Sequence, residues 1–183
     1  YWDKEHYDGW LDSDVGFARH ALSIDEDRAD FPRVVWADRR EVAKNEGKTP
    51  QWLDQVWFAG CHSDVGGSYA EDESRLSDIA LDWMVCELKK CVPEIEINES
   101  MLVRNPDPLG LHHKEASMMT IGKFSIPWKI KPREVESEFR LHPTVLERLS
   151  ASHVPHPTET KLYRPSQLAN HPQARDFYDQ DGA

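Results

Sequence analysis

A short buried strand that runs into a glycine-bounded loop constrains the fold of this chain most. Val56 to Ala59 are all apolar and include strand-favouring residues, a pattern typical of a strand buried on both faces of a mostly parallel sheet. The chain then continues through Gly60 to His62 and on to Tyr69. Because α/β proteins place their sites at the carboxyl ends of such strands, His62 is the first candidate for proton chemistry.

A helix is predicted directly after this loop. Apolar residues recur at helical spacing from Leu76 to Cys91, and Pro93 follows the last of them. Strand, loop and helix together form the unit from which α/β sheets are built. We also expect a helix within Asp14 to Ile24, a short strand over 33–36 and a polar surface loop over 41–50.

Proline is distributed unevenly and suggests two regions. Of the 12 prolines, two precede residue 90 and ten follow it. We therefore expect regular α/β structure over 1–92. A proline- and loop-rich extension over 93–183 should pack on the same domain.

Composition excludes several classes of protein. The formal net charge of −11 argues against a nucleic-acid partner, because phosphate binding needs a basic surface. Three cysteines are an odd number without zinc-ribbon spacing, so we expect reduced thiols, no structural metal and no cofactor. The chain has no apolar run of about 18 residues and no recognisable export signal, so we expect it not to span a membrane.

Several segments of the chain resemble one known family. Residues 21–26, 56–69 and 76–84, with later segments at 142–148 and 163–168, are similar to the catalytic domain of type VI secretion lipase effectors. The resemblance implies an α/β-hydrolase-like fold and a serine hydrolase of acyl esters, in some members phospholipids. Because the sequence shows no signal peptide and no membrane span, we expect a soluble protein that is cytoplasmic or delivered by a secretion apparatus.

The resemblance further implies that His62 is the base of a catalytic triad. Family members carry the nucleophilic serine and the triad aspartate upstream, and this chain has no Gly-x-Ser-x-Gly turn to present a serine. We therefore expect the C-terminal portion of a hydrolase, inactive alone, whose partner is the upstream half of the same domain.

Other residues of the histidine loop are expected to support it. Asp64 lies too close in sequence to His62 to reach the far side of the imidazole, so a bracing role through backbone amides is expected. Gly66 and Gly67 fit a turn or a close approach of backbone to ligand. Ser68 is a poor nucleophile, because no helical pattern begins directly after it and three acidic residues follow at 71–73.

Two histidine pairs and one basic segment are further candidates for a functional role. The pairs His112-His113 and His153-x-x-His156 are expected to be solvated rather than metal ligands. Residues 121–133 carry four positive charges and no acid, with apolar residues alternating between them. This pattern suits either an edge strand protected by lysines or a peripheral membrane contact through Trp128 and Lys129.

Two alternatives to a serine esterase stay open. A metal-dependent phosphoesterase would use His62 and Asp64 as ligands. A non-catalytic fragment would bind a lipid or a partner without chemistry.

Overall fold

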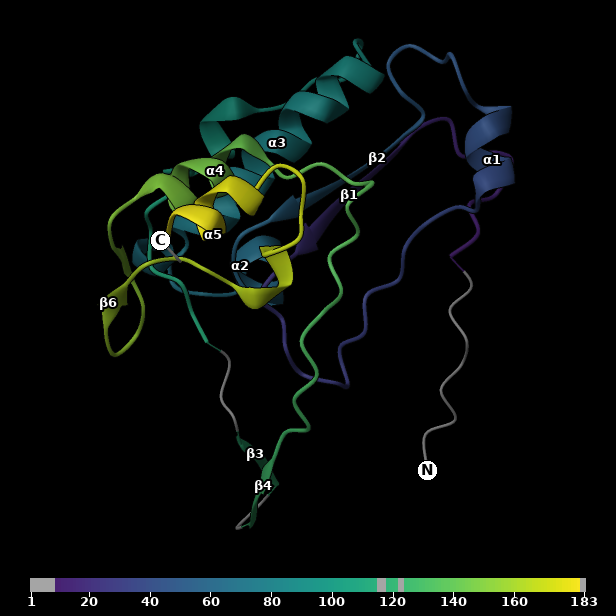
Figure 1. Ribbon diagram of the computed structural model, residues 1–183. Coiled ribbons are helices and arrows are strands. Elements are labelled where there is room, and N and C mark those ends of the chain that lie inside the picture. The colour runs from purple at the N-terminus through teal and green to yellow at the C-terminus, as the bar shows by residue number, and fades with distance from the viewer. Residues whose placement is uncertain (1–8, 115–117, 122–123, 182–183) are drawn as a thin grey trace.

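A pair of parallel strands lies at the centre of the fold (Figure 1). The computed structural model describes residues 9–114, 118–121 and 124–181. Strand β1 (Ala18–Ser23) pairs in parallel with β2 (Leu53–Phe58), in a register that runs from Ala18 opposite Leu53 to Ser23 opposite Phe58. The fold is therefore mixed α/β with a small parallel sheet, which is the coarse form of the predicted class.

Strand β2 lies in the interior, as predicted for Val56 to Ala59. Val56 and Trp57 are fully buried, and the strand ends one residue short of the predicted end. On the edge away from β1, the backbone of Trp57 bonds to Arg140 and His142 at 3.0 and 2.9 Å. Both edges of β2 are thus occupied, so β2 is an interior strand of the fold.

Two apolar clusters sandwich this strand. On one face, helix α3 (Arg75–Cys91) packs through Ile79 and Trp83 against Val56 and Phe58. On the other face, Trp57 packs with residues of α4 (Pro143–Ser150) and of the C-terminal region. The C-terminal region therefore completes the core around β2.

The helix predicted over Leu76–Cys91 is confirmed, with one difference in its packing. Ile79 and Trp83 are buried, but Leu88, which belongs to the same apolar repeat, is 40% exposed. Position 87, not 88, continues the face that starts at 79 and 83 at intervals of four. Glu87 is buried there, and its carboxylate pairs with the guanidinium of Arg19 on β1 at 2.8 Å.

The helix predicted within Asp14 to Ile24 is wrong, because this segment contains β1. Ala18, Ala21 and Leu22 have the spacing of a helical face, yet their backbone joins a parallel ladder with β2. A short strand covered on both sides need not alternate, so three small apolar residues can fit either period.

The segment between β1 and β2 also differs from expectation. No strand forms over 33–36, where the backbone N–H of Trp36 donates to the Gln55 side chain at 2.8 Å. The loop predicted over 41–50 begins inside helix α1 (Arg39–Lys44). Asp38 and Glu41 form a capping box that satisfies the free N–H groups at the start of this helix.

The remaining elements are short. The loop predicted after His62 starts as a single helical turn, α2 (His62–Gly66). Within the segment 121–133, for which an edge strand was one of two expectations, residues Phe124–Pro127 form β4, which pairs with β3 (Met118–Ile121) in a hairpin that projects from the body (Figure 1). The others are η1 (Glu71–Glu73), η2 (Glu99–Met101), β5 (Val154–Pro155), β6 (Thr160–Lys161), η3 (Ser166–Leu168) and α5 (Arg175–Asp181). All three cysteines are free.

Gly60, between β2 and α2, cannot carry a side chain. Its φ of +106° lies in the region that glycine tolerates and other residues rarely adopt. A Cβ built at this position would lie 2.3 Å from Cβ of Asp64. The turn that positions His62 therefore requires a glycine at position 60.

We expect Gly60→Ala to lower the free energy of unfolding by at least about 2 kcal/mol, from backbone strain and overlap together. Gly16→Ala is the matched control, because nothing lies within 4 Å of its Cβ position and no positive φ is involved. It should change stability by less than about 0.5 kcal/mol. Equal midpoints of thermal unfolding for the two variants would contradict this account of the turn.

Candidate functional site

The parallel register brings two polar segments together at the carboxyl ends of the central strands. Asp25 and Glu26 follow β1, and His62 follows β2. Backbone hydrogen bonds extend the pairing past the strands, from Ile24 to Phe58 at 2.9 Å and from Asp25 to Gly60 at 3.0 Å. This edge of a parallel sheet is where α/β proteins bind ligands.

The carboxylate of Glu26 holds the imidazole of His62. Its Oε2 lies 2.5 Å from Nδ1 of His62, and Glu26 is 1% exposed whereas the imidazole is 41% exposed. We assign the Nδ1–H tautomer, because the carboxylate oxygen of Glu26 can only accept and lies closer to Nδ1 than the guanidinium nitrogen of Arg28, at 2.5 against 2.8 Å. Nε2 then carries the free lone pair and can act as a base.

Arg28 fixes Glu26 in turn. Its guanidinium donates to both carboxylate oxygens at 2.9 and 2.8 Å, and its backbone N–H donates to Oε1 at 3.0 Å. Burial alone raises the pKa of Glu26, but the hydrogen bonds from Arg28 and His62 outweigh it and lower this pKa to about 2. Glu26 is therefore ionised throughout the physiological range of pH.

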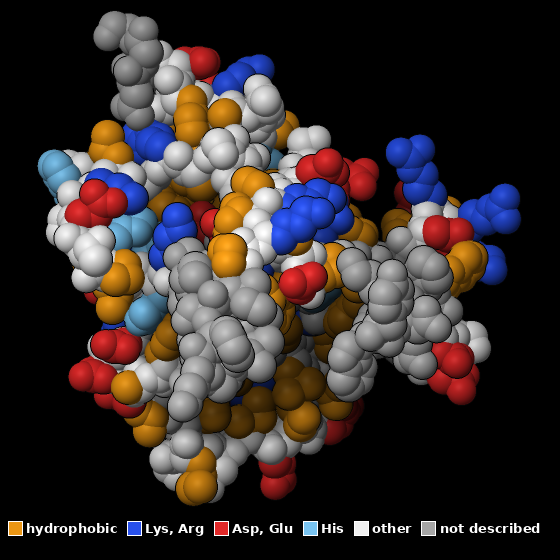
Figure 2. Space-filling view, turned by 90° about the horizontal axis from the view of Figure 1, so that it is seen from below, with side chains coloured by type: hydrophobic (Ala, Val, Ile, Leu, Met, Phe, Trp, Pro, Cys, Tyr) orange, Lys and Arg blue, Asp and Glu red, His pale blue; other side chains and the backbone are white. Residues whose placement is uncertain are grey.

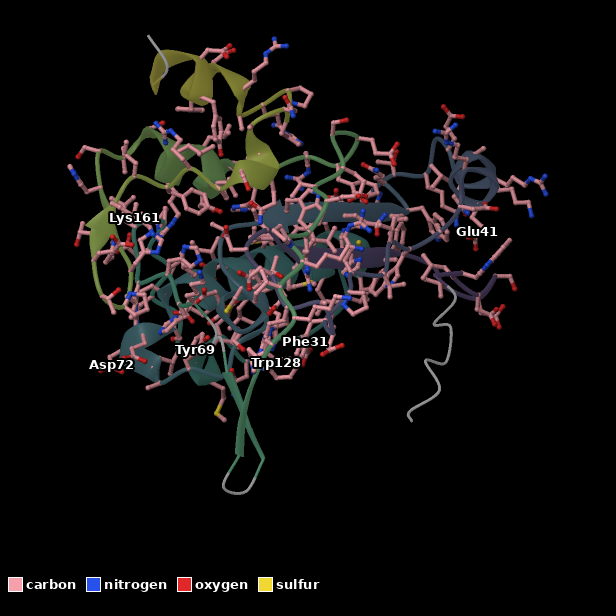
Figure 3. All side chains as sticks on the ribbon, turned by 60° about the horizontal axis from the view of Figure 1, so that its bottom comes forward. Phe31, Glu41, Tyr69, Asp72, Trp128 and Lys161 are labelled. Atoms are coloured by element: carbon pink, nitrogen blue, oxygen red, sulfur yellow. The ribbon has the colours of Figure 1, made fainter. Side chains whose placement is uncertain are left out.

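Aromatic side chains border this ion-paired group. The ring of Phe31 stacks on that of His62, with centroids 4.9 Å apart and planes 15° apart. The Arg28 guanidinium lies 4.1 Å from the centre of the Phe31 ring. Trp128 contacts Phe31 edge to face at 5.9 Å, and Figure 3 shows the two side chains beside one another.

His62 borders a cavity of about 580 Å³. The cavity follows β1 on the side away from β2, and α2 and α3 form its other walls together with residues 32–36. Most of its lining is apolar, for example Leu22, Val65 and Met84, and Arg33 and Arg133 supply positive charge. Such a space can accept an apolar chain or segment beside the imidazole.

The other predicted loop residues lie around this site in different roles. Asp64 is 1% exposed, and its Oδ2 accepts from the N–H groups of Cys61 and His113 at 3.1 and 3.2 Å. Its Oδ1 lies 2.7 Å from Nδ1 of His113. Gly66 and Gly67 line the cavity, and Gly67 has a φ of +83°.

Histidines that we expected to be solvated are largely buried. His112 is 8% exposed, and its ring lies 4.7 Å from that of His156, whose pKa burial and the neighbouring His112 lower to about 4. His113 stacks on Tyr69 at 3.6 Å and is held by Asp64. Only His153 is exposed among the four, because the chain after α3 returns across the site instead of running over the surface.

Asp25, Glu26 and Arg28 were not found by the sequence analysis. Asp25 ties the site to the C-terminal region, since its Oδ2 accepts from the N–H of Gly60 and from the hydroxyl of Tyr163, both at 2.7 Å. Tyr163 is fully buried, which raises the pKa of its hydroxyl. These residues follow the end of a strand, but the spacing of Ala18, Ala21 and Leu22 also fits a helix and so hides that end in the sequence.

Comparison with known proteins agrees with the resemblance noted from the sequence. Residues 2–87 match the model of the T6SS phospholipase effector Tle1-like catalytic domain. The match covers slightly less than half of the chain. The matched residues include β1, β2, α2 and most of α3, and thus both Glu26 and His62. Neither the curated proteins nor the solved structures gave a match.

The Tle1-like segment suggests lipase or phospholipase activity and fits delivery by a type VI secretion system. Among the residues that the structure describes, no helix is long and apolar enough to cross a membrane. The described residues also contain no group of three or more His, Cys, Asp and Glu side chains placed to hold a metal ion.

The depressed pKa of Glu26 predicts a pH dependence of stability. The folded state binds fewer protons than the unfolded state between pH of about 2 and the usual value of 4.5, so stability falls as pH falls through this window. The loss from this group should be on the order of 3 kcal/mol. Glu26→Gln should remove this part of the acid sensitivity.

Unfolding in denaturant at pH 2.5 to 6 measures the effect. Glu147→Gln, which alters an exposed carboxylate on α4, is the control and should keep the wild-type slope of stability against pH. A wild-type slope in Glu26→Gln would contradict the assignment of Glu26 as an ionised, hydrogen-bonded group.

Proposed function

We propose that this chain is part of a serine acyl-ester hydrolase of the phospholipase type, in which His62 is the general base and Glu26 orients it. One observation carries the proposal: a buried carboxylate lies 2.5 Å from Nδ1 of an imidazole at the carboxyl ends of two parallel strands. This is the relation between acid and base in a catalytic triad. The Tle1-like match supports the substrate class.

The chemistry follows from the position of the proton. Nε2 of His62 takes the proton of a serine hydroxyl as its oxygen attacks the ester carbonyl, and the resulting imidazolium returns that proton to the leaving alcohol. Water then hydrolyses the acyl-enzyme with the same base. Glu26 stays ionised and stabilises the imidazolium, as its pKa of about 2 favours.

The nucleophile is proposed to come from a segment upstream of residue 1. In α/β-hydrolases the triad residues follow the order serine, acid, histidine, and Glu26 and His62 occupy the second and third places. The acid is therefore proposed to lie in this chain, not upstream as the family resemblance implied. Among the described strands β1 pairs with β2 alone, so its other edge, beside the cavity, suits an added strand.

Ser63 requires a separate test because its hydroxyl lies 3.2 Å from Nε2 of His62. It directly follows His62 at the start of α2 and is 7% exposed, so a substrate carbonyl has little access to its oxygen. We assign Ser63 the hydrogen-bond position that the nucleophile takes in the complete enzyme.

The metal-dependent alternative receives no support from the site. Both oxygens of Asp64 already accept hydrogen bonds from Cys61 and His113, and Nδ1 of His62 is held by Glu26. The two proposed ligands thus face different partners. A complete protein that folds but hydrolyses no ester would indicate the non-catalytic role.

In the complete protein, His62→Ala should lower turnover of a short soluble ester by about 10⁴-fold or more, and Glu26→Gln by about 10²- to 10⁴-fold. Ser63→Ala is the matched control and should stay within a few-fold of wild type. Turnover and thermal unfolding are measured together, so that loss of fold is distinguished from loss of chemistry.

Three outcomes would contradict the proposal. Wild-type turnover in a folded His62→Ala variant would exclude the base assignment, and complete loss in Ser63→Ala would make Ser63 the nucleophile. Activity lost on chelation and restored by a divalent metal would favour the phosphoesterase.

A further inference from the structure

The hairpin of β3 and β4 projects from the body (Figure 1). The residues that follow it bond to the backbone beside Arg28. Its strands pair with each other, and with no other strand of the described residues. In the register of the two strands, Met119 lies opposite Ile126 and Ile121 opposite Phe124. The sequence from 117 to 133 contains no Asp or Glu. An isolated two-stranded hairpin is marginal in water, so one with this composition suits contact with an apolar phase.

The base of the hairpin carries the residue types of a lipid–water interface. Ile130 is 50% exposed, Trp128 is partly buried, and Lys129 and Lys131 are exposed. Tryptophan and lysine near apolar residues are the groups that anchor proteins at the level of lipid headgroups. Figure 2, seen from the hairpin side, shows hydrophobic side chains gathered around a hollow on this face.

Backbone hydrogen bonds join this base to the segment that carries Arg28. The N–H of Ala29 donates to the carbonyl of Lys129 at 2.8 Å, and the N–H of Lys131 donates to the carbonyl of Asp27 at 2.6 Å. Arg28 lies between these bonds and contacts both Glu26 and the Trp128 ring. The hairpin and the catalytic pair are therefore held by the same short stretch of backbone.

Stacked side chains make a second connection. Trp128 contacts Phe31, and Phe31 stacks on His62. The ring of Trp128 is thus connected to the imidazole of His62 through one intervening ring, that of Phe31.

We propose that the β3–β4 hairpin, with Trp128, Lys129 and Lys131 at its base, docks on the surface of a phospholipid bilayer that contains anionic lipid. The chain as a whole has a net charge of −11, so a positively charged segment without acids is an exception that matches an anionic surface. The proposal rests on the proposed function in one respect, that the lipid bound by the hairpin is also the substrate.

The test measures binding of the complete protein to vesicles by flotation. The vesicles contain phosphatidylcholine alone, or phosphatidylcholine with phosphatidylglycerol as about a third of the lipid. Phe124→Ser with Ile126→Ser should weaken partition into anionic vesicles about 100-fold. Lys129→Gln with Lys131→Gln should weaken it by about tenfold or more, and raised salt should reduce the difference between the lysine variant and wild type.

The matched control is Met101→Ser with Val103→Ser, which removes two apolar residues that are 76% and 66% exposed in the segment after α3. It should bind vesicles as wild type does. All variants should hydrolyse a short soluble ester at rates close to wild type, because the contacts that the structure describes for His62 and Glu26 involve none of the altered positions.

The soluble ester separates the two proposals. Vesicle binding that requires the hairpin, in a protein inactive on every ester, would sustain the docking proposal and remove the proposed function. Wild-type vesicle binding by both hairpin variants would overturn the docking proposal. So would an equal loss in the control pair, which would indicate non-specific adsorption of exposed apolar residues.

Discussion

The parallel register of β1 and β2 is the constraint on which the rest of the structure depends. Because Ser23 lies opposite Phe58, the chains leave the sheet side by side, and the next few residues of each strand meet. A slip of one residue would turn these side chains to the other face. The positive φ of Gly60 then turns the chain into α2, so that His62 faces the segment after β1.

Charges around this junction are compensated within a small volume. Glu26 is buried, and an unpaired carboxylate there would be costly, but Arg28 and His62 supply donors to it. The second carboxylate, Asp25, is satisfied by Gly60 and Tyr163. Tyr163 belongs to the C-terminal region, so this region, though outside the Tle1-like match, contributes directly to the order of the site.

The sequence predicted the strand and helix that position His62 but not the acid beside it. The helical repeat from Leu76 is long enough to exclude another period, and the short apolar run from Val56 to Ala59 ends at a glycine, as a buried strand does. Ala18, Ala21 and Leu22 fit both a helix and a buried strand, and the choice of helix concealed the end of a strand at Asp25 and Glu26. The spacing of Asp38 and Glu41 is that of a capping box and indicates the start of a helix, but the polar composition of 41–50 favoured a loop.

The tautomer of His62 tests the central claim most directly. When the imidazole of His62 is neutral, ¹⁵N NMR of the labelled ring should show the proton on Nδ1, where Glu26 accepts its hydrogen bond, and no proton on Nε2. Glu26→Gln should weaken this preference, whereas Glu147→Gln should leave it unchanged. A proton on Nε2, with Nδ1 accepting from the Arg28 guanidinium 2.8 Å away, would contradict the assignment of Glu26 and His62 as an acid–base pair.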